Sequence, residues 1–180
     1  SCSTSITLFM NNSLQEYLNF ANKLADVAGI TSMEYFRTSL SIDNKSDESP
    51  VTIADKNTEL KIRSLIENEY PDHGILGEEF DSVNPDAEFI WVIDPIDGTR
   101  SYIAGHKDFG NLISLTQNKK PIIGIINCPA HDERWVGAKN QSSTVNQQTV
   151  NTSNVTAIED AYIFTSGLYF DEPNLRNACL

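Results

Sequence analysis

Apolar residues recur at helical spacing in two stretches of the N-terminal half. The first predicted helix begins at Ser13, because Ser13 and Glu16 fit a capping box, and its pattern is compatible with a continuation to Phe36. The second is predicted from Thr52, a good N-cap residue, to about Tyr70. We expect the apolar positions of the first helix to be core packing rather than a ligand face; they are Leu14, Tyr17, Leu18, Ala21, Leu24, Ala25 and Ala28. The apolar positions of the second helix are Ile53, Leu60, Ile62, Leu65 and Ile66.

Shorter apolar runs after the helices predict strands. Residues 89–93 are five apolar residues in a row, typical of a strand buried on both faces, and residues 74–77 predict a short strand that ends at Glu78 and Glu79. An antiparallel meander is predicted at residues 111–116, 121–127 and 134–138, with turns at 118–119 and 130–132. Short strands are also predicted at 39–43 and 161–165, and an exposed strand or loop at 142–154. Helices first and strands mostly afterwards favour a layered α+β sandwich with a mostly antiparallel sheet.

Composition narrows the class of protein. The 180 residues suffice for one domain with a real core, in which residues 1–12 are expected to be disordered. The net charge of −12 argues against nucleic acid and anionic membrane as partners. No apolar stretch is long enough to span a bilayer. Three widely spaced cysteines fit neither a disulfide framework nor a zinc site, so we expect a cytoplasmic setting.

The strand at residues 89–93 leads into the segment with the most chemical content. It delivers Asp94 to the strand end, where Pro95 cannot donate to the ladder, and Asp97 follows in the turn. Gly98 allows close backbone approach, and Thr99 is expected to cap a short helix. Two carboxylates beside helix-start amides suit a hard divalent cation and a phosphate together. An acidic surface turn after a core strand is the alternative.

Glu78 adds a third acidic residue at the end of an element. If its strand neighbours the strand of Asp94, the carboxylates of Glu78, Asp94 and Asp97 converge at one sheet edge. Such a cluster would repel itself without a cation, and Mg²⁺ prefers oxygen ligands. Asp55 and Thr99 could then relay protons from a metal-activated water. For Asp55, compensation of the helix N-terminal charge is an equal alternative.

Two other phosphatase chemistries fit less well. Aspartyl-phosphate enzymes use two aspartates separated by one residue, but the residue two after Asp94 is Ile96. Cys128 and Arg134 have the Cys-x5-Arg spacing of cysteine phosphatases. In that loop backbone amides bind the phosphate, whereas Pro129 has no amide and two acidic residues precede Arg134. Cys128 is therefore interpreted as a packed thiol, and the three histidines as solvated surface residues.

Three segments, in order and in spacing, resemble the inositol monophosphatase superfamily. They are residues 49–55 (SPVTIAD), 77–79 (GEE) and 94–99 (DPIDGT). The superfamily comprises Mg²⁺-dependent, lithium-sensitive phosphomonoesterases with a layered α/β sandwich of the sugar phosphatase type. Within it, residues 71–80 and 98–103 look most like the histidinol-phosphate phosphatase branch. The resemblance runs from about Leu14 to about Phe170 and implies two long N-terminal helices.

The resemblance also implies roles for individual residues. Metal ligands would be Glu78, Asp94, the Ile96 carbonyl and Asp97; catalytic residues Asp55, Thr99 and Glu78; phosphate-binding residues Gly98, Thr99 and Arg100. The cofactor would be Mg²⁺, with Mn²⁺ as an alternative. Lys45 lies where the family often has a lysine facing the outer metal, although a solvated loop lysine fits equally. Partners would be a small phosphate ester and a second copy in a homodimer.

One departure from the family bears on activity. Members usually continue into a further part with a Trp-Asp motif, whose aspartate completes a second metal site. Nothing after Phe170 matches that part, so we expect either a fragment or a shortened protein, with one site largely preformed and a second one weak. Three functions stay open: a histidinol phosphatase, an inositol monophosphate phosphatase, and a non-catalytic fragment.

Overall fold

The computed structural model describes residues 2–39, 42–44 and 50–162. Residues 1–150 form one compact unit and residues 151–180 a second, and each is described by itself. In the second unit the described residues hold one short 3-10 helix, η1 (Ile158–Asp160). The prediction of a single domain over residues 1–180 stays a prediction. Of the predicted strand at 161–165, residues 161 and 162 are not in a strand and the rest lies outside the described residues, as does Lys45.

The described residues of the first unit include the helices α1 (Cys2–Tyr35), α2 (Ile53–Glu69) and α3 (Thr99–Ile103). The predicted start of α1 at Ser13 is wrong, because the helix continues upstream to Cys2. No glycine or proline interrupts residues 2–12, which we expected to be disordered. The predicted bounds of α2 are confirmed: Thr52 is its N-cap, Tyr70 its C-cap. None of the described helices is long and apolar enough to cross a membrane.

Two sheets complete the first unit. A small antiparallel pair consists of β1 (Ile42–Asn44) and β2 (Pro50–Thr52). The large sheet has the order β3-β4-β5-β6-β7-β8-β9. Its strands are β3 (Gly74–Leu76), β4 (Phe89–Asp97), β5 (Gly110–Gln117), β6 (Lys120–Cys128), β7 (Glu133–Ala138), β8 (Thr144–Val145) and β9 (Gln148–Thr149). Among the strands that the structure describes, only β3 and β4 pair in parallel, so the predicted α+β fold with a mostly antiparallel sheet is confirmed.

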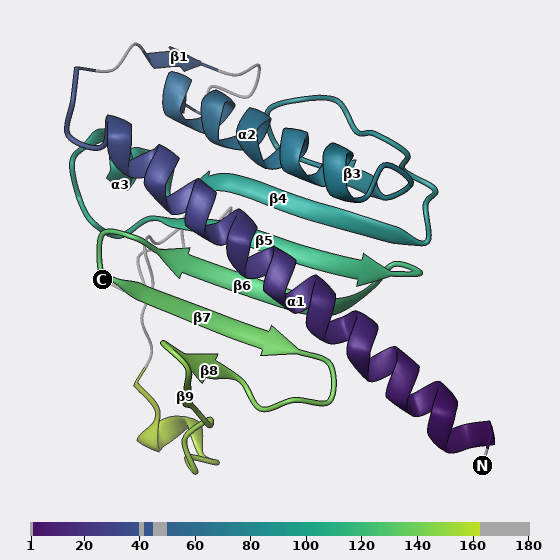
Figure 1. The fold of residues 1–180 in the computed structure, drawn as a ribbon. Coiled ribbons are helices and arrows are strands. Elements are labelled where there is room, and N and C mark those ends of the chain that lie inside the picture. The colour runs from purple at the N-terminus through teal and green to yellow at the C-terminus, as the bar shows by residue number, and fades with distance from the viewer. Residues whose placement is uncertain (1, 40–41, 45–49, 163–180) are drawn as a thin grey trace, which may run out of the picture. The chain divides into compact units, whose positions relative to one another are not determined.

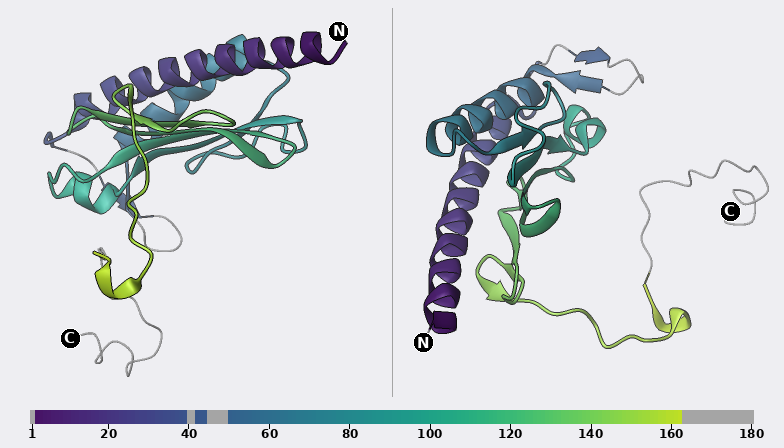
Figure 2. Two further views of the ribbon diagram at one scale, coloured as in Figure 1. Left: turned by 90° about the horizontal axis from the view of Figure 1, so that it is seen from below. Right: turned by 90° about the vertical axis from the view of Figure 1, so that its right-hand side faces the viewer.

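Helices α1 and α2 lie side by side on one face of the large sheet (Figures 1 and 2). This covered face carries alternate strand residues, which pack against the apolar positions of both helices. Its buried residues include Trp91, Ile93, Ile113, Leu115, Ile123 and Ile125, with Leu24, Ala25, Ala28, Ile62 and Ile66 from the helices. The helical periodicity of the first helix therefore marked core packing, whereas Ile53 and Leu60 of α2 are 43% and 49% exposed.

Neither α1 nor α2 covers the other face, here called the open face (Figure 2). The prediction that β4 is buried on both faces is wrong, because its alternate residues Ile90 and Val92, on the open face, are only partly buried. On the neighbouring strands Ile126 is 50% exposed and Trp135 41% exposed. A shallow depression of about 660 Å³ runs along this face, and Asp94 and Asp97 are among the residues that line it.

We predicted that this strand would end at Asp94, but β4 continues to Asp97. Its pairing with β5 shifts register between Asp94 and Asp97, and it resumes at the pair Asp97–Gly110. We expected Pro95 to end the strand because it has no amide donor. At the register shift the ladder needs no donor from residue 95, so the strand continues past it. Strand β4 thus passes through the segment that carries the candidate chemistry.

Candidate metal and phosphate site

Glu78 and Asp94 are brought together by the only parallel pair of strands in the large sheet. Strands β3 and β4 are neighbours with the register Leu76–Val92, and Glu78 follows β3 by two residues, as Asp94 follows Val92. The sequence argument required this adjacency, and the structure provides it. Asp97 lies at the end of β4, beyond the register shift.

The carboxyl group of Asp94 is in an unusual environment. Its Oδ1 atom is buried and has no hydrogen-bond partner among the described residues. Burial raises the pKa of Asp94 most, and the charge and hydrogen bond of Glu78 and the charge of Asp97 raise the pKa further, to about 8. An unpartnered buried oxygen beside two other carboxyl groups is what a divalent cation would stabilise.

The donor set therefore fits a hard cation such as Mg²⁺. The available donors are the three carboxyl groups and the Ile96 carbonyl, all of them oxygens. In the described part of the chain, however, no group of three His, Cys, Asp or Glu side chains is placed to hold a metal ion. The structure thus supplies the chemistry of a metal site without a closed set of ligands.

Asp55 and Thr99 meet, as predicted, at the start of two helices. Asp55 is buried in the capping box of α2, where its Oδ2 atom accepts from the Thr52 amide at 2.8 Å and from the Thr52 hydroxyl at 2.6 Å. Its Oδ1 atom lies 3.5 Å from the Thr99 hydroxyl, which donates to the Ile96 carbonyl at 3.0 Å. Both interpretations of Asp55 thus describe real contacts: it caps a helix and it faces Thr99.

The turn into α3 corrects one prediction. Gly98, not Thr99, is the N-cap of α3, and Thr99 is the first helical residue. Gly98 has φ +82°, and a Cβ atom there would lie 2.9 Å from the Asp108 carbonyl oxygen. Glycine is therefore required for both conformation and space, and no side chain caps this helix. Arg100, the third predicted phosphate-binding residue, is exposed on α3.

A buried ion pair that we did not predict from the sequence fixes the turn after β3. Glu59 is fully buried, and its Oε2 atom accepts from the backbone amides of Glu78 and Glu79 at 2.9 and 2.8 Å. Arg63 donates to Glu59 Oε1 at 2.8 Å and to the Phe80 carbonyl at 2.9 Å. Both carboxylate oxygens of Glu59 accept hydrogen bonds, and Arg63 donates to two acceptors. The ion pair therefore holds the turn that carries Glu78.

A signal for this pair was present in the sequence. Glu59 and Arg63 are spaced four residues apart, and they share the helix face of Ile62 and Ile66, which α2 buries. Two opposite charges on the buried face of a helix predict a buried ion pair. Gly77 supports it, because a Cβ atom there would collide with the Glu59 carboxylate.

Cys128 and His73, which the sequence did not assign to the site, are both partly buried. Burial, then Glu133 and Asp97, raise the pKa of the Cys128 thiol, which disfavours the thiolate that a cysteine phosphatase needs. His73 is not a solvated surface residue as predicted: it stacks between Tyr70 and Phe89, and its Nδ1 atom accepts from Trp91 Nε1 at 3.1 Å. Burial lowers the pKa of His73 as its largest cause.

Comparison with known proteins decides the family. The model of the inositol monophosphatase family matches residues 13–178, almost the whole chain. The chain belongs to the inositol monophosphatase family. The resemblance found in three sequence segments is thereby confirmed, and relatives named histidinol-phosphatase are among the matches, as the branch assignment predicts.

Curated relatives in the inositol monophosphatase family agree with this placement. The chain is 39% identical over 155 residues to bifunctional phosphatase IMPL2, chloroplastic, of Arabidopsis thaliana, covering 85% of this chain and 45% of that protein. It is 37% identical over 158 residues to histidinol-phosphatase of Chlorobaculum parvum, covering 87% and 61%. The chain thus spans about half the length of the curated relatives it matches.

Solved structures confirm the fold. An inositol monophosphatase from Zymomonas mobilis is 44% identical and superposes with a TM-score of 0.68, over 79% of this chain and 55% of that one. An inositol monophosphatase from Anabaena is 33% identical with a TM-score of 0.69, over 79% and 52%. The layered sandwich of the inositol monophosphatase type is therefore the fold of this chain.

Proposed function

We propose that the protein is a metal-dependent phosphomonoesterase in which a water molecule attacks a small phosphate ester. The observation that supports this most is the unpartnered buried oxygen of Asp94 beside Glu78 and Asp97. Mg²⁺ is the proposed metal, with Mn²⁺ as the alternative, because all the available donors are oxygens. Catalytic activity of this chain, which spans about half the length of its relatives, is part of the proposal.

Each ligand has a proposed part in holding the metal. Asp94 would hold the metal together with Glu78 of the turn after β3 and with Ile96 and Asp97 of its own strand. The metal, when bound, supplies an activated water and charge for the phosphate oxygens. The amides of Gly98 and Thr99, with Arg100, receive the phosphate at the turn into α3.

Asp55 and Thr99 are proposed to orient the attacking water. Asp55 Oδ2 accepts hydrogen bonds from the Thr52 amide and hydroxyl, and Asp55 Oδ1 lies 3.5 Å from the Thr99 hydroxyl. In this proposal the Thr99 hydroxyl turns from the Ile96 carbonyl to donate to Asp55 Oδ1, and Thr99 Oγ1 then accepts a hydrogen bond from water. Glu78 assists in orienting this water from the other side of the site.

The substrate proposed first is histidinol phosphate, because relatives at 35% and 37% identity carry that name. Inositol monophosphate is the alternative, since a relative at 30% identity is named inositol-1-monophosphatase. A non-catalytic fragment is the third reading, because the ligand set is not closed in the described residues. We further propose a cytoplasmic homodimer. Nucleic acid and anionic membrane are not among the proposed partners, because both would repel a chain with a net charge of −12.

The test is phosphate release from histidinol phosphate and inositol monophosphates, measured during a Mg²⁺ titration with this chain and with any longer form of the protein. Asp94→Asn should abolish metal-dependent release and leave the fold intact, whereas Asp86→Asn, the same change at an exposed position, should not. Near-normal Mg²⁺ activation of Asp94→Asn would remove Asp94 from the site. Release by the longer form alone would support the fragment reading for this chain.

A further inference from the structure

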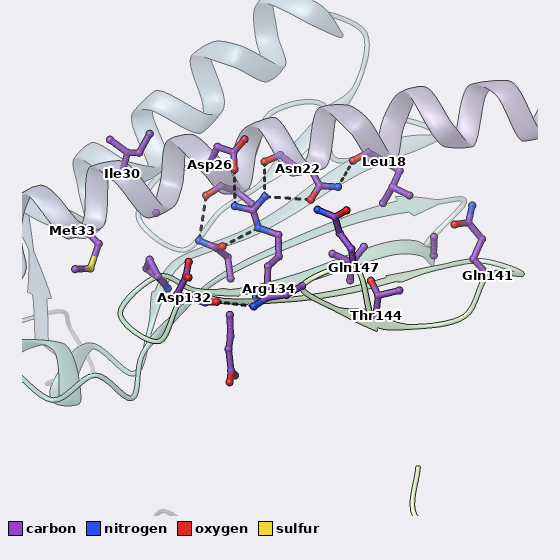
Figure 3. Close-up of a pocket in the computed structure, with 18 of the residues that line it drawn as sticks. Leu18, Asn22, Asp26, Ile30, Met33, Asp132, Arg134, Gln141, Thr144 and Gln147 are labelled. Carbon is purple, nitrogen blue, oxygen red and sulfur yellow. Dashed lines mark hydrogen bonds and ion pairs between the residues drawn. The ribbon is translucent and has the colours of Figure 1, made fainter. Parts of the chain in front are cut away.

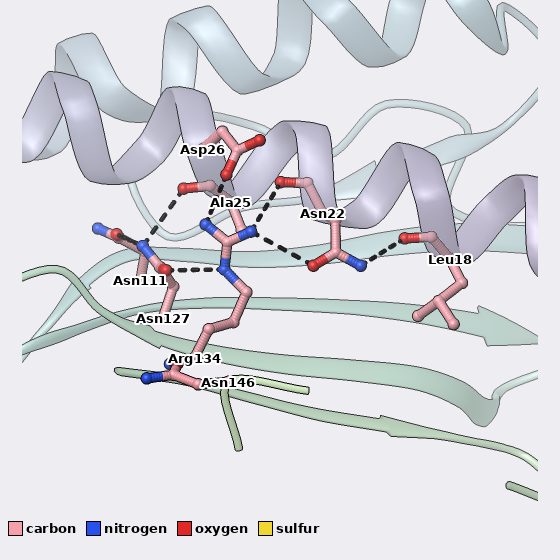
Figure 4. A network of polar contacts seen from close by, with 8 residues as sticks. All are labelled: Leu18, Asn22, Ala25, Asp26, Asn111, Asn127, Arg134 and Asn146. Atoms are coloured by element: carbon pink, nitrogen blue, oxygen red, sulfur yellow. Dashed lines mark hydrogen bonds and ion pairs between the residues drawn. The ribbon is translucent and has the colours of Figure 1, made fainter. Parts of the chain in front are cut away.

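Three polar side chains form a row across the otherwise apolar covered face of the sheet. Asn111 of β5 is the register partner of Asn127 of β6, and Asn127 is the partner of Arg134 of β7. Asn111 is fully buried and Asn127 nearly so. Figure 4 shows the row continuing from Arg134 to Asp26 on α1.

Arg134 also borders a groove of about 1020 Å³ between α1 and strands β6 to β8 (Figure 3). All three nitrogens of its guanidinium group donate to acceptors within the protein. The group donates to Asp26 Oδ1 at 2.7 Å, to Asn127 Oδ1 at 2.9 Å, and to the side chain and carbonyl of Asn22 at 3.3 and 3.4 Å. The role of Arg134 is therefore inside the protein.

The hydrogen bonds of the row all run in one direction. Arginine can only donate, so the atom of Asn127 that faces Arg134 must be its oxygen. This places the Asn127 amide nitrogen 2.9 Å from the oxygen of Asn111. The amide nitrogen of Asn111 must then donate onward, and the acceptor is the Pro95 carbonyl at 2.7 Å. Bonds aligned in this way polarise and strengthen one another.

The end of the row lies at the candidate metal site. Pro95 is in the register shift of β4, between the proposed ligands Asp94 and Ile96. The bond from Asn111 fixes the orientation of the peptide group that joins Pro95 to Ile96. The next carbonyl along the chain, that of Ile96, is held by the Thr99 hydroxyl. Two consecutive carbonyls of the shifted segment are thus oriented by side chains.

We propose that Asn111 is a positioning residue for the metal-binding segment 94–97, and that Arg134, acting through Asn127, keeps the Asn111 amide in the donating orientation. This rests on the proposed function, since it takes Asp94, Ile96 and Asp97 as metal ligands. Residues that hold metal ligands in place commonly affect metal affinity as strongly as some ligands do.

The test compares Asn111→Leu with Asn22→Leu, a matched control. Asn22 also contacts Arg134, but it lies on α1 outside the row. In the metal-free protein, hydrogen exchange of the amides at residues 96–99 should be about tenfold faster in Asn111→Leu and unchanged in the control. Calorimetry should show an about tenfold weaker Mg²⁺ affinity in Asn111→Leu only.

A second variant keeps the test decisive if Asn111→Leu does not fold. Arg134→Met removes the donor at the far end of the row, where the side chain is partly exposed. It should still accelerate exchange at residues 96–99, by about threefold. Unchanged exchange in either folded variant, or equal acceleration by Asn22→Leu, would overturn the proposal. If the unmodified chain binds no Mg²⁺ at millimolar concentration, the metal proposal fails for this chain, and exchange of the metal-free protein still decides the role of Asn111.

Discussion

The covered and open faces of the large sheet come from the same strands but differ in almost every property. On the covered face, Trp91 of β4 is fully buried under the two long helices. On the open face, Trp135 of β7 is 41% exposed. Adjacent residues of β6 show the same contrast, since Ile125 is buried and Ile126 is half exposed. Stability is therefore concentrated on one face.

The two faces also divide the work at the candidate site. The side chains of Asp94 and Asp97 border the depression on the open face. The contact that orients the Pro95 carbonyl comes from Asn111, on the covered face. Reactive groups thus lie where a ligand can reach them, while the groups that hold the backbone lie in the packed interior. Successive side chains of a strand point to opposite faces of the sheet. Residues 94–97 can therefore expose reactive groups on the open face while their backbone is held from the covered face.

The largest expected effect compares the two tryptophans. Trp91→Ala should lower the free energy of unfolding by about 3–5 kcal/mol, because it leaves a large cavity under α1 and α2. It also removes the indole donor to His73. Trp135→Ala, the same change on the open face, should cost about 1 kcal/mol or less. Urea unfolding followed by circular dichroism measures both, and similar losses would show that the open face is covered in solution.

The next effect concerns the buried ion pair that supports Glu78. Glu59→Gln should cost about 3 kcal/mol, because Arg63 then stays buried without a compensating charge. Mg²⁺ affinity should fall as well, since the amides of Glu78 and Glu79 lose a carboxylate acceptor. Glu67→Gln, an exposed position on the same helix, is the control for both unfolding and calorimetry. Loss of stability with unchanged Mg²⁺ affinity would separate Glu59 from the site.

The pH dependence of stability should report on Asp94. In the metal-free folded protein this carboxyl group keeps its proton up to about pH 8, whereas the unfolded chain releases it near the model-peptide pKa of about 3.9. Between these values the folded state binds more protons, so stability should decrease as pH rises from about 4 to about 8. Asp94→Asn should flatten this slope in thermal melts from pH 5 to pH 8. An equally steep slope in the variant would assign the effect to another group.

Changes to the exposed apolar residues of the open face should have the smallest effect on stability and a measurable effect on self-association. Replacing Ile126 and Trp135 together by threonine should change the free energy of unfolding by about 1 kcal/mol. It should also shift the chain toward monomer in sedimentation velocity, because exposed apolar side chains on a sheet face favour self-association. An unchanged distribution of species would place any association elsewhere on the surface.

The sequence was sufficient to predict site residues that lie at the ends of strands and helices, where local patterns are clearest. The convergence of Glu78 and Asp94 follows from two apolar runs that end in acids, once the strands are neighbours. The capping residue Thr52 and its partner Asp55 were recognised from residue type and spacing. The three motifs that resemble the inositol monophosphatase family lie in these same places, which is why family and site residues were predicted together.

Other features depend on contacts between distant segments, which no local pattern contains. The partner of Asn111 is sixteen residues away in either direction along the chain, at Pro95 and at Asn127. The burial of β4 on one face only depends on what covers the sheet, and a run of five apolar residues does not encode that. The N-cap at Gly98 was missed because residue preference favoured Thr99, whereas the turn required a positive φ.

The parallel pairing of β3 with β4 has a consequence for the order in which this protein folds. Parallel neighbours cannot be joined by a tight hairpin, so Glu78 approaches Asp94 only after the intervening residues have closed a crossover. Until then the acidic groups are far apart and solvated. Glu78 and Asp94 come together only when β3 pairs with β4, and their repulsion opposes that step when both are ionised and no cation is present. A divalent cation in the refolding buffer would therefore act mainly by slowing the separation of β3 from β4, and would change the early, hairpin-rich β5 to β7 steps little.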